Sequence, residues 1–405
     1  MEFQFDNRNK AEDVFRIINI FLVWIFFLNA MYIPADTLFN MKKVSLVLLL
    51  LLNLRLYFSN RPNYSFRIIG YGFGLTLFSI VYSIALTGEI GTNINSGYVG
   101  CILLLLPIAV YYNIDLEKIF VVTMKIMAVF IVVMGILHLV GMMNVYKNPI
   151  LMWLYYTDNA KVNPNAVTII GFSIFLLASP VLVILLPYFI KNRNVVWTII
   201  TACALFFSGT RANVLCGIAC VVCCLILKKT GLVSKAFIVL IVLICLAAVI
   251  TDGSLINYFH GWSENKVGGD VVRDETLTSI FSYWNDNPFS LVSGSGFSSV
   301  FYSEGRKEFV SNAELSYWIL LRRVGIPLFI VFMSMFLYPV YRLMKDESQR
   351  LIAIGYLFYL IIAYTNPLLY GSTGMTVVLV MYYLCHIQDN KNNSLVYIDK
   401  ISQKS

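Results

Sequence analysis

Long apolar runs recur along almost the whole chain, and this feature most limits what the chain can fold into. A helix needs about 20 apolar residues to cross the hydrocarbon core of a bilayer. About twelve runs are long enough, or nearly long enough, to do so. They lie near 15–34, 44–58, 68–87, 97–112, 119–143, 166–189, 195–209, 213–227, 233–250, 315–341, 351–370 and 372–388. We therefore expect an all-α polytopic membrane protein with about twelve transmembrane helices.

The composition favours the same fold class. Hydrophobic residues make up 59% of the 405 residues and charged residues only 13%, whereas soluble domains carry about 25% charged residues. This excludes a water-soluble enzyme and a disordered or nucleic-acid-coating protein, so nucleic acid is not an expected partner. The eight cysteines are too few in so long a chain to indicate a secreted disulfide scaffold.

The positive charges predict an orientation. The net charge is +8, from 30 Lys and Arg against 22 Asp and Glu, and membrane proteins of any function concentrate Lys and Arg in cytoplasmic loops. The first apolar run is too long for a cleavable signal peptide and lacks its small-residue cleavage site. Arg8, Lys10 and Arg16 hold the N-terminus in the cytoplasm, and alternation from there leaves more than half of the Lys and Arg on the cytoplasmic side. We expect both termini to be cytoplasmic.

One long polar segment, 251–312, lies between the ninth and tenth runs, and we expect it to form a large periplasmic loop. Apart from this insertion, residues 1–405 are expected to form a single integral membrane domain. A shorter polar segment, 144–165, links the fifth and sixth runs. No internal repeat is visible in the sequence, which argues against an inverted-repeat transporter.

The residues that usually bind metals are poorly placed for it. Four of the cysteines fall in the motif CGIACVVCC (216–224), inside an apolar run with no His or carboxylate beside them, where cysteine acts as a small hydrophobic side chain. The three histidines are scattered without the spacing of metal ligands: they are His138, His260 and His386. We expect neither a metal nor a cofactor.

Arg211 stands in the motif SGTRAN (208–213), between two apolar runs. A charge at the membrane boundary is costly unless it faces a cavity or a partner. One interpretation is an arginine whose head reaches the lipid headgroups. The other is a guanidinium that faces a phosphate group, which it binds with paired hydrogen bonds.

The long loop contains a second arginine on the same predicted side of the membrane. Arg273 begins a predicted amphipathic helix, which the sequence 286–288 (DNP) ends. Gly294 and Gly296 then allow a tight turn. The apolar side of this helix carries Leu277, Ile280, Phe281 and Trp284. The helix is either an ordinary surface helix or a support that brings Arg273 near Arg211.

Glu314 precedes the tenth run, in the sequence AELSYWILLRRVGIPL (313–328). Residues four apart share a helical face, so Arg322 falls on the face of Glu314, with Arg323 beside it. A carboxylate at a membrane boundary near arginines is either an ion-pair partner or a proton acceptor.

Together these motifs, in this order, resemble those of the O-antigen polymerase and ligase superfamily of bacterial membrane glycosyltransferases. The resemblance covers roughly the C-terminal 60% of the chain. It is carried by NPN (163–165), SGTRAN (208–213), the Arg273 helix with DNP and GSGF (294–297), and the sequence 313–328. It implies a GT-C-like fold and a metal-independent, inverting transfer of a glycan from undecaprenyl pyrophosphate to an acceptor hydroxyl on the periplasmic face of the inner membrane.

The resemblance also implies roles for individual residues. Arg211 and Arg273 bind the pyrophosphate, Glu314 is the general base, and the remaining substrate-binding residues are Asn163, Asn165, Arg322 and Arg323. The implied partners are undecaprenyl-pyrophosphate-linked oligosaccharide, membrane lipids and a protein that regulates chain length. Glu314 stands where ligases of the superfamily usually carry a histidine, which favours a polysaccharide polymerase.

Three other functions stay open at this stage. The first is a ligase that transfers the glycan to lipid A-core. The second is a flippase or transporter of lipid-linked sugars, which would place ionisable residues near the bilayer midplane; Lys125 is the main residue of that kind. The third is a sensor or scaffold without catalysis.

Overall fold

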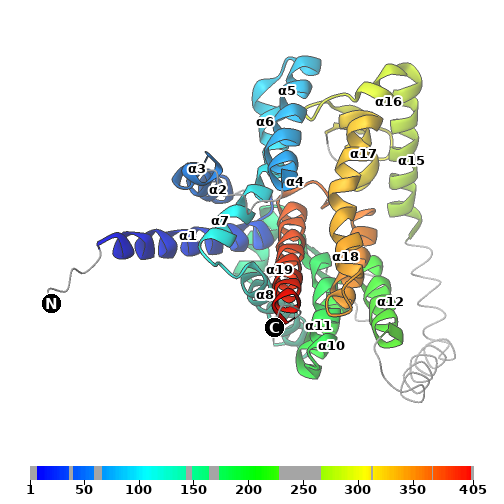
Figure 1. The fold of residues 1–405 in the computed structure, drawn as a ribbon. Helices are drawn as coiled ribbons and strands as arrows, with labels where there is room; N and C mark the ends of the chain where they lie inside the picture. The colour runs from blue at the N-terminus through cyan, green and yellow to red at the C-terminus, as the bar shows by residue number, and fades with distance from the viewer. Residues whose placement is uncertain are drawn as a thin grey trace.

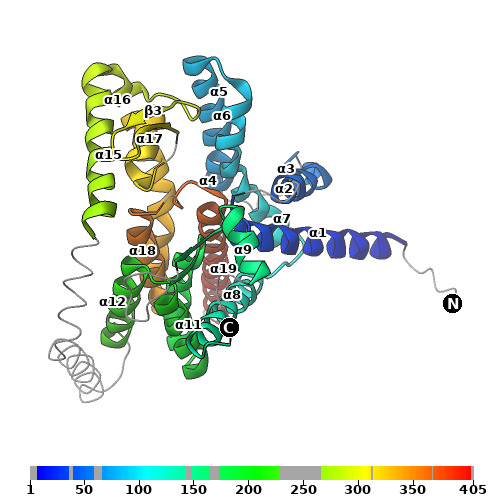
Figure 2. The ribbon, with the colours of Figure 1, turned by 180° about the vertical axis from the view of Figure 1, so that it is seen from behind.

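The computed structural model describes residues 7–35, 40–58, 66–142, 148–163, 173–227, 266–311, 313–366 and 368–402. These residues are mostly helical, as the sequence predicts. They also form two antiparallel ribbons of two strands each, which the expectation of an all-α fold did not include. Figure 1 shows the helical bundle, and Figure 2 shows it from behind.

The first part of the described chain is helical throughout. Its elements are α1 (Asn7–Tyr32), α2 (Met41–Leu52), α3 (Leu54–Phe58), α4 (Phe66–Ile69), the π-helix η1 (Gly70–Leu75), α5 (Thr76–Thr87), α6 (Ile90–Gly97), the 3-10 helix η2 (Tyr98–Leu104), α7 (Leu105–Tyr111) and α8 (Leu116–Leu139).

The rest of the described chain adds the strands. Its elements are α9 (Pro149–Tyr156), β1 (Ala160–Asn163), β2 (Ser173–Leu176), the 3-10 helix η4 (Ser179–Ile184), α10 (Leu185–Lys191), α11 (Val195–Phe207), α12 (Arg211–Leu227), α15 (Lys266–Asp286), α16 (Phe289–Ser293), β3 (Phe301–Ser303), β4 (Glu308–Val310), α17 (Ser316–Met344), α18 (Arg350–Ala363) and α19 (Ser372–Ser402).

Within the described residues, five helical segments are long and apolar enough to cross a membrane. They are Glu12–Tyr32, Arg67–Thr87, Ile90–Tyr111, Leu116–Leu139 and Ser316–Met344. They match the first, third, fourth, fifth and tenth expected spans. The structure is therefore that of a mostly helical protein with several helices suited to a bilayer, as the apolar runs predict.

Other expected spans differ from the structure. The run at 166–189 does not form one helix, because Ser173–Leu176 is a strand and helical structure begins only at Ser179. Pro180 lies in the first turn of this helical segment, where proline is tolerated because its missing N–H would have no partner within the helix. The run at 44–58 is interrupted at Asn53, between α2 and α3. The ninth expected span, 233–250, lies outside the described residues.

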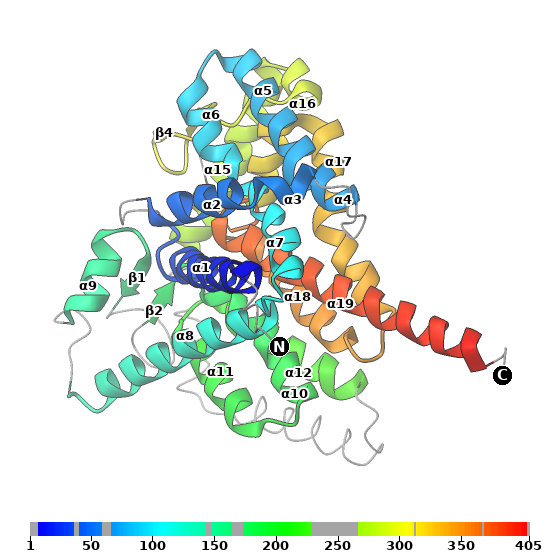
Figure 3. The ribbon, with the colours of Figure 1, turned by 60° about the vertical axis from the view of Figure 1, so that its left-hand side comes forward.

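The first half of α19 forms the centre of the hydrophobic core. It packs against α1, α7, α8 and α17, as Figure 1 shows. Met375, Val377 and Leu379 along it are fully buried. Two of its buried hydroxyls are satisfied: that of Thr373 donates to the carbonyl of Ala30 at 2.7 Å, and that of Tyr382 donates to the carbonyl of Met335 at 3.1 Å. In Figure 3, α8, α10, α11 and α12 gather on the side opposite α5, α6 and α16.

Gly325 divides α17 into two helical pieces. Its φ of 73° and ψ of 169° are not helical, and Pro327 has no N–H to offer the carbonyl of Arg323. The carbonyls of Arg322 and Arg323 instead accept hydrogen bonds from the backbone N–H groups of Ser295 and Gly296, both at 2.9 Å. The loop after α16 is thereby fixed to the break in α17.

The described part of the long loop, from α15 to β4, has a small apolar core of its own. This core joins α15 to the start of α17, because Ile280 and Ile319 both belong to it; beside it, the ring centres of Phe281 and Trp318 lie 5.4 Å apart. Its buried residues are Ile280, Trp284, Phe301, Val310, Ala313 and Ile319. As predicted, the helix ends at Asp286, but it begins earlier than expected, at Lys266. Residues 251–265 of the predicted loop lie outside the described residues.

Candidate functional site

A cluster of three charged side chains lies where α15, β1 and the residues before α17 meet. Glu314 accepts hydrogen bonds from Nε and Nη2 of Arg273 to its Oε2, at 3.0 and 2.9 Å. Its other oxygen, Oε1, lies 3.2 Å from Nζ of Lys161. The resemblance assigned Arg273 and Glu314 to one site, but their direct ion pair was not predicted, and the sequence did not single out Lys161. We call these three residues the charge cluster.

The ribbon β1–β2 positions Lys161. Lys161 pairs with Phe175 in the antiparallel register, and its neighbours Ala160 and Val162 are buried. Because successive side chains of a strand point to opposite faces, Lys161 points away from this apolar face. Its side chain is 68% exposed.

The start of α17 positions Glu314. The flanking residues Ala313 and Leu315 are buried, and the hydroxyl of Ser316 donates to the carbonyl of Asn366. These contacts hold the backbone and leave the Glu314 side chain half-buried at the surface, with 28% of it exposed.

The two cations set the protonation state of Glu314. Partial burial raises the pKa of its carboxyl group, but the positive charges and hydrogen bonds of Lys161 and Arg273 outweigh this effect. The net result is a pKa below the usual value. Glu314 is therefore a carboxylate near neutral pH, and while it is bound to both cations it is a weak proton acceptor.

A small polar cup of about 140 Å³ lies beside the charge cluster. Arg273 and Glu314 form part of its wall, and Arg306 from the turn between β3 and β4 adds another guanidinium. The remaining wall residues are Val272, Thr276, Ala313 and Leu315. An anion in this cup would meet two arginines at once.

A larger apolar groove of about 510 Å³ lies between α12, α17 and α18. Ala212, which follows Arg211 directly, and Tyr317, three residues after Glu314, both line it. Tyr364 at the end of α18 lines it as well. Sequence neighbours of Arg211 and of Glu314 therefore line the same groove, whose other lining residues include Met333, Leu337, Leu357 and Ile361.

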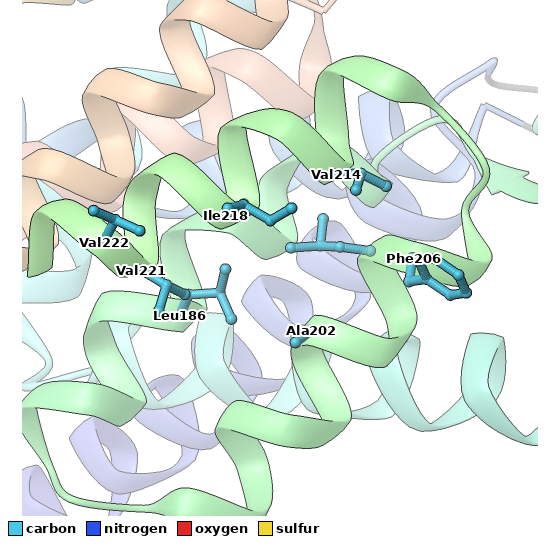
Figure 4. Close-up of a pocket in the computed structure, with 9 residues that line it drawn as sticks. Leu186, Ala202, Phe206, Val214, Ile218, Val221 and Val222 are labelled. Atoms are coloured by element: carbon cyan, nitrogen blue, oxygen red, sulfur yellow. The ribbon is translucent and has the colours of Figure 1, made fainter. Parts of the chain in front are cut away.

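A second apolar pocket, of about 260 Å³, lies on another side of α12 (Figure 4). Leu186, Ala202 and Phe206 from α10 and α11 line it, together with Val214 and Ile218 from α12. In Figure 4 these side chains occupy the space between the neighbouring helices. Apolar spaces thus flank the helix that Arg211 begins.

The motif SGTRAN forms the turn between α11 and α12. Gly209 adopts a φ of 69°, and the buried Asn213 side chain donates to the hydroxyls of Ser208 and Ser179 at 3.0 and 3.3 Å. Arg211 is the first residue of α12 and is half-buried. The described ion pairs of Glu314 are with Lys161 and Arg273 rather than with Arg211.

Arg322 and Arg323 directly precede the break in α17, and the described ion pairs of Glu314 do not include them. Arg322 is fully buried and donates to Oγ and the carbonyl of Ser299 at 3.0 and 2.9 Å. Its guanidinium lies 4.6 Å from the centre of the Phe301 ring. Arg323 donates to the carbonyl of Ser311 at 2.7 Å. In this structure both arginines bind the chain itself.

The two asparagines of the NPN motif are described only in part. Asn163 is the last residue of β1 and pairs with Ser173. Its side chain and the whole of Asn165 lie outside what the structure describes, so their predicted role in substrate binding stays a prediction.

Packing within the protein accounts for Lys125 and for two cysteines of α12. Lys125 lies within α8 with its Nζ 4.6 Å from the centre of the Trp197 ring and 5.5 Å from that of Phe189, so aromatic faces stabilise its charge. Cys220 and Cys224 are buried among apolar side chains. Within the described ranges, no three His, Cys, Asp or Glu residues are grouped to hold a metal ion.

No family model, curated protein or solved structure matches the chain.

Proposed function

We propose that the protein is a polysaccharide polymerase of the bacterial inner membrane. It transfers a growing glycan from undecaprenyl pyrophosphate to a hydroxyl of another lipid-linked repeat unit, on the periplasmic face. The proposal includes twelve spans with both termini in the cytoplasm, a GT-C-like fold and a protein partner that regulates chain length.

The position of the charge cluster carries this proposal. Arg273 and Lys161 each bind an oxygen of the Glu314 carboxylate and remain partly exposed, and Tyr317, three residues after Glu314, lines the large apolar groove. A polyprenyl pyrophosphate needs both features, since its head is anionic and its tail is a long hydrocarbon. In this arrangement the cations bind the diphosphate, and the groove of α12, α17 and α18 accommodates the adjoining part of the lipid.

The proposed reaction is a single displacement at the anomeric carbon. The acceptor oxygen forms the new bond to this carbon, while the bond from the carbon to the pyrophosphate oxygen breaks and undecaprenyl pyrophosphate leaves with the electron pair. The acceptor hydroxyl loses its proton to Glu314. Arg211, Arg273 and Lys161 stabilise the charge that develops on the leaving group.

The rival functions differ in what the same site must do. A ligase uses the same donor and needs a separate acceptor such as lipid A-core. A transporter would use an ionisable residue in the membrane helices, and Lys125 is stacked on Trp197 instead. Catalysis at the charge cluster is therefore the function that the site supports best.

A polymerisation assay tests the proposal. Purified protein in detergent, given only lipid-linked repeat units, should produce a ladder of longer glycans. Arg273→Gln and Glu314→Gln should each slow the ladder at least about a hundredfold, the usual effect of removing a group that stabilises transition-state charge or accepts the proton. Lys307→Gln is the matched control. Like Arg273→Gln it removes one positive charge, but Lys307 is exposed and lies outside the cup.

Three outcomes would contradict the polymerase. Ladder formation at the normal rate by both variants removes the catalytic roles of Arg273 and Glu314. Glycan transfer only after addition of a separate acceptor identifies a ligase. Movement of the lipid-linked unit across a vesicle membrane without chain growth identifies a transporter.

A further inference from the structure

The polar cup beside the charge cluster contains a cation that the sequence did not single out. Arg306 lies in the turn between β3 and β4 and lines the cup with Arg273 and Glu314. It is exposed, and the ion pairs found among the described residues do not include it.

The fold fixes the distance between this turn and α15. A Cβ atom on Gly305 would lie 2.2 Å from the carbonyl oxygen of Val272, the residue before Arg273. Only glycine permits this approach. The ribbon is also held by a 2.8 Å hydrogen bond between the hydroxyls of Thr276 and Ser303. Arg306 is thus presented to the cup by a rigid contact between the ribbon and α15.

The cluster and the cup together carry an excess of positive charge. Lys161, Arg273 and Arg306 supply three positive charges, and Glu314 supplies one negative charge, which leaves an excess of two. Glu304 and Glu308 on the same ribbon are exposed and do not line the cup. An anion with two or more charges would balance this excess, whereas the carboxylate of Glu314 alone does not.

A diphosphate would also compete directly with Glu314 for its cations. It offers more acceptor oxygens and more negative charge than a carboxylate, and guanidinium groups bind phosphate oxygens with paired hydrogen bonds. Glu314 is only half-buried, so its side chain has room to leave Arg273 when such an anion arrives.

We propose that the cup and the adjoining charge cluster together form a diphosphate-binding site whose cations are Lys161, Arg273 and Arg306, and that Glu314 is an internal anion which the diphosphate displaces. The identity of the ligand as the diphosphate of a lipid-linked glycan rests on the proposed function. Displacement releases the carboxylate from the two cations that make it a weak base. Binding of the donor thereby produces the proton acceptor that the transfer needs.

Titration of the full-length protein in detergent with inorganic pyrophosphate, followed by calorimetry, tests the site. Arg306→Gln and Lys161→Gln should each weaken binding about tenfold, the effect of losing one charge-assisted hydrogen bond. Lys307→Gln, on the same turn but outside the cup, should leave the affinity unchanged. Unchanged affinity in both Arg306→Gln and Lys161→Gln overturns the site.

Glu314→Gln gives the decisive result. A carboxylate that competes with the ligand predicts tighter pyrophosphate binding when it is neutralised, whereas a carboxylate that holds the cations in place for the ligand predicts weaker binding. If Glu314 competes with the ligand, its neutralisation should tighten pyrophosphate binding by about tenfold, since the cations no longer have an internal partner. Equal or weaker binding by Glu314→Gln overturns the displacement. The exposed variants Arg306→Gln and Lys161→Gln test the site even if Glu314→Gln fails to fold.

Two further experiments distinguish a diphosphate from ordinary lipid headgroups as the ligand, and the proposed site from the proposed polymerase activity. At a salt concentration that screens the surface potential of the lipid, protein in nanodiscs containing phosphatidylglycerol should bind pyrophosphate as tightly as protein in neutral nanodiscs. Weaker binding under these conditions would assign the cup to ordinary headgroups and overturn the diphosphate site. Pyrophosphate binding with the expected variant pattern, but no glycan ladder, would leave the site standing and reject the polymerase. A ladder with unchanged pyrophosphate affinity in all cup variants would do the reverse.

Discussion

The charge cluster and the break in α17 both use arginine, but in opposite ways. Arg273 is half-exposed and binds a carboxylate that an incoming anion can replace. Arg322 is fully buried, and its two Nη atoms donate to Ser299 of the chain itself. The comparison teaches what makes an arginine in this fold available to a ligand. Its guanidinium must be open to water, and the group that it binds must be one that another anion can replace.

The difference follows from what surrounds each guanidinium. At the cluster, Lys161 and Arg273 remain 68% and 37% exposed, so water screens their charges and their net contribution to stability is small. At the break in α17, the Arg322 guanidinium faces the Phe301 ring and bridges to the loop after α16. Removing it leaves the half-buried acceptors of Ser299 without this donor, which costs more than the bond itself contributes.

The largest expected effect on stability is therefore at Arg322. Arg322→Gln loses two charge-assisted hydrogen bonds to Ser299 and the packing on Phe301, and it should lower the free energy of unfolding by about 3 kcal/mol. Arg273→Gln should lower it by less than about 1 kcal/mol. Thermal or urea unfolding in the same detergent measures both. Equal destabilisation by the two variants would remove the distinction between the sites.

The sequence predicted one of these sites better than the other, and the reason is physical. Glu314 directly precedes an apolar run, and a charge in that position needs a partner. The resemblance assigned Glu314 and Arg273 to one site, but helical spacing indicated Arg322, not Arg273, as the arginine nearest Glu314. The same reasoning treated Arg322 and Arg323 as further ligands, because helical spacing alone does not reveal which side chains a later loop covers.

The break in α17 had a signal in the sequence that the length of the apolar run obscured. The expected span 315–341 is continuous in hydropathy, yet it contains Gly325 and Pro327, which interrupt helices. Conversely, nothing in the segment around Lys161 predicted that β1 would bring it to Glu314, because the two residues are 153 positions apart. Contacts between distant parts of the chain depend on the tertiary fold, and hydropathy does not encode them.

The next largest effect concerns the loop that covers Arg322. Gly294 has a φ of 76°, and a Cβ atom there would lie 2.5 Å from the carbonyl oxygen of Arg323. Gly294→Ala should therefore lower the free energy of unfolding by about 2 kcal/mol, since it adds backbone strain and separates the loop from α17.

Gly91→Ala is the matched control, because a Cβ atom at Gly91 in α6 meets no atom within 4 Å and alanine favours helix. It should be neutral or slightly stabilising. A Gly294→Ala protein as stable as Gly91→Ala would show that the loop is not fixed to the break in α17 as the structure has it.

The smallest expected effect is at the charge cluster, and it depends on pH. Because the folded protein lowers the pKa of Glu314 below its ordinary value of 4.5, this carboxylate stabilises the fold at pH values above 4.5. The contribution is lost as the pH falls from 4.5 through the lower pKa of the folded state. Glu314→Gln should thus be less stable than the wild type by at most about 1 kcal/mol at pH 7, and the difference should shrink in acid. Unfolding curves of both proteins from pH 7 down to acid measure it, and a difference that grows toward acid would mean that Glu314 is protonated, not ion-paired, in the folded protein.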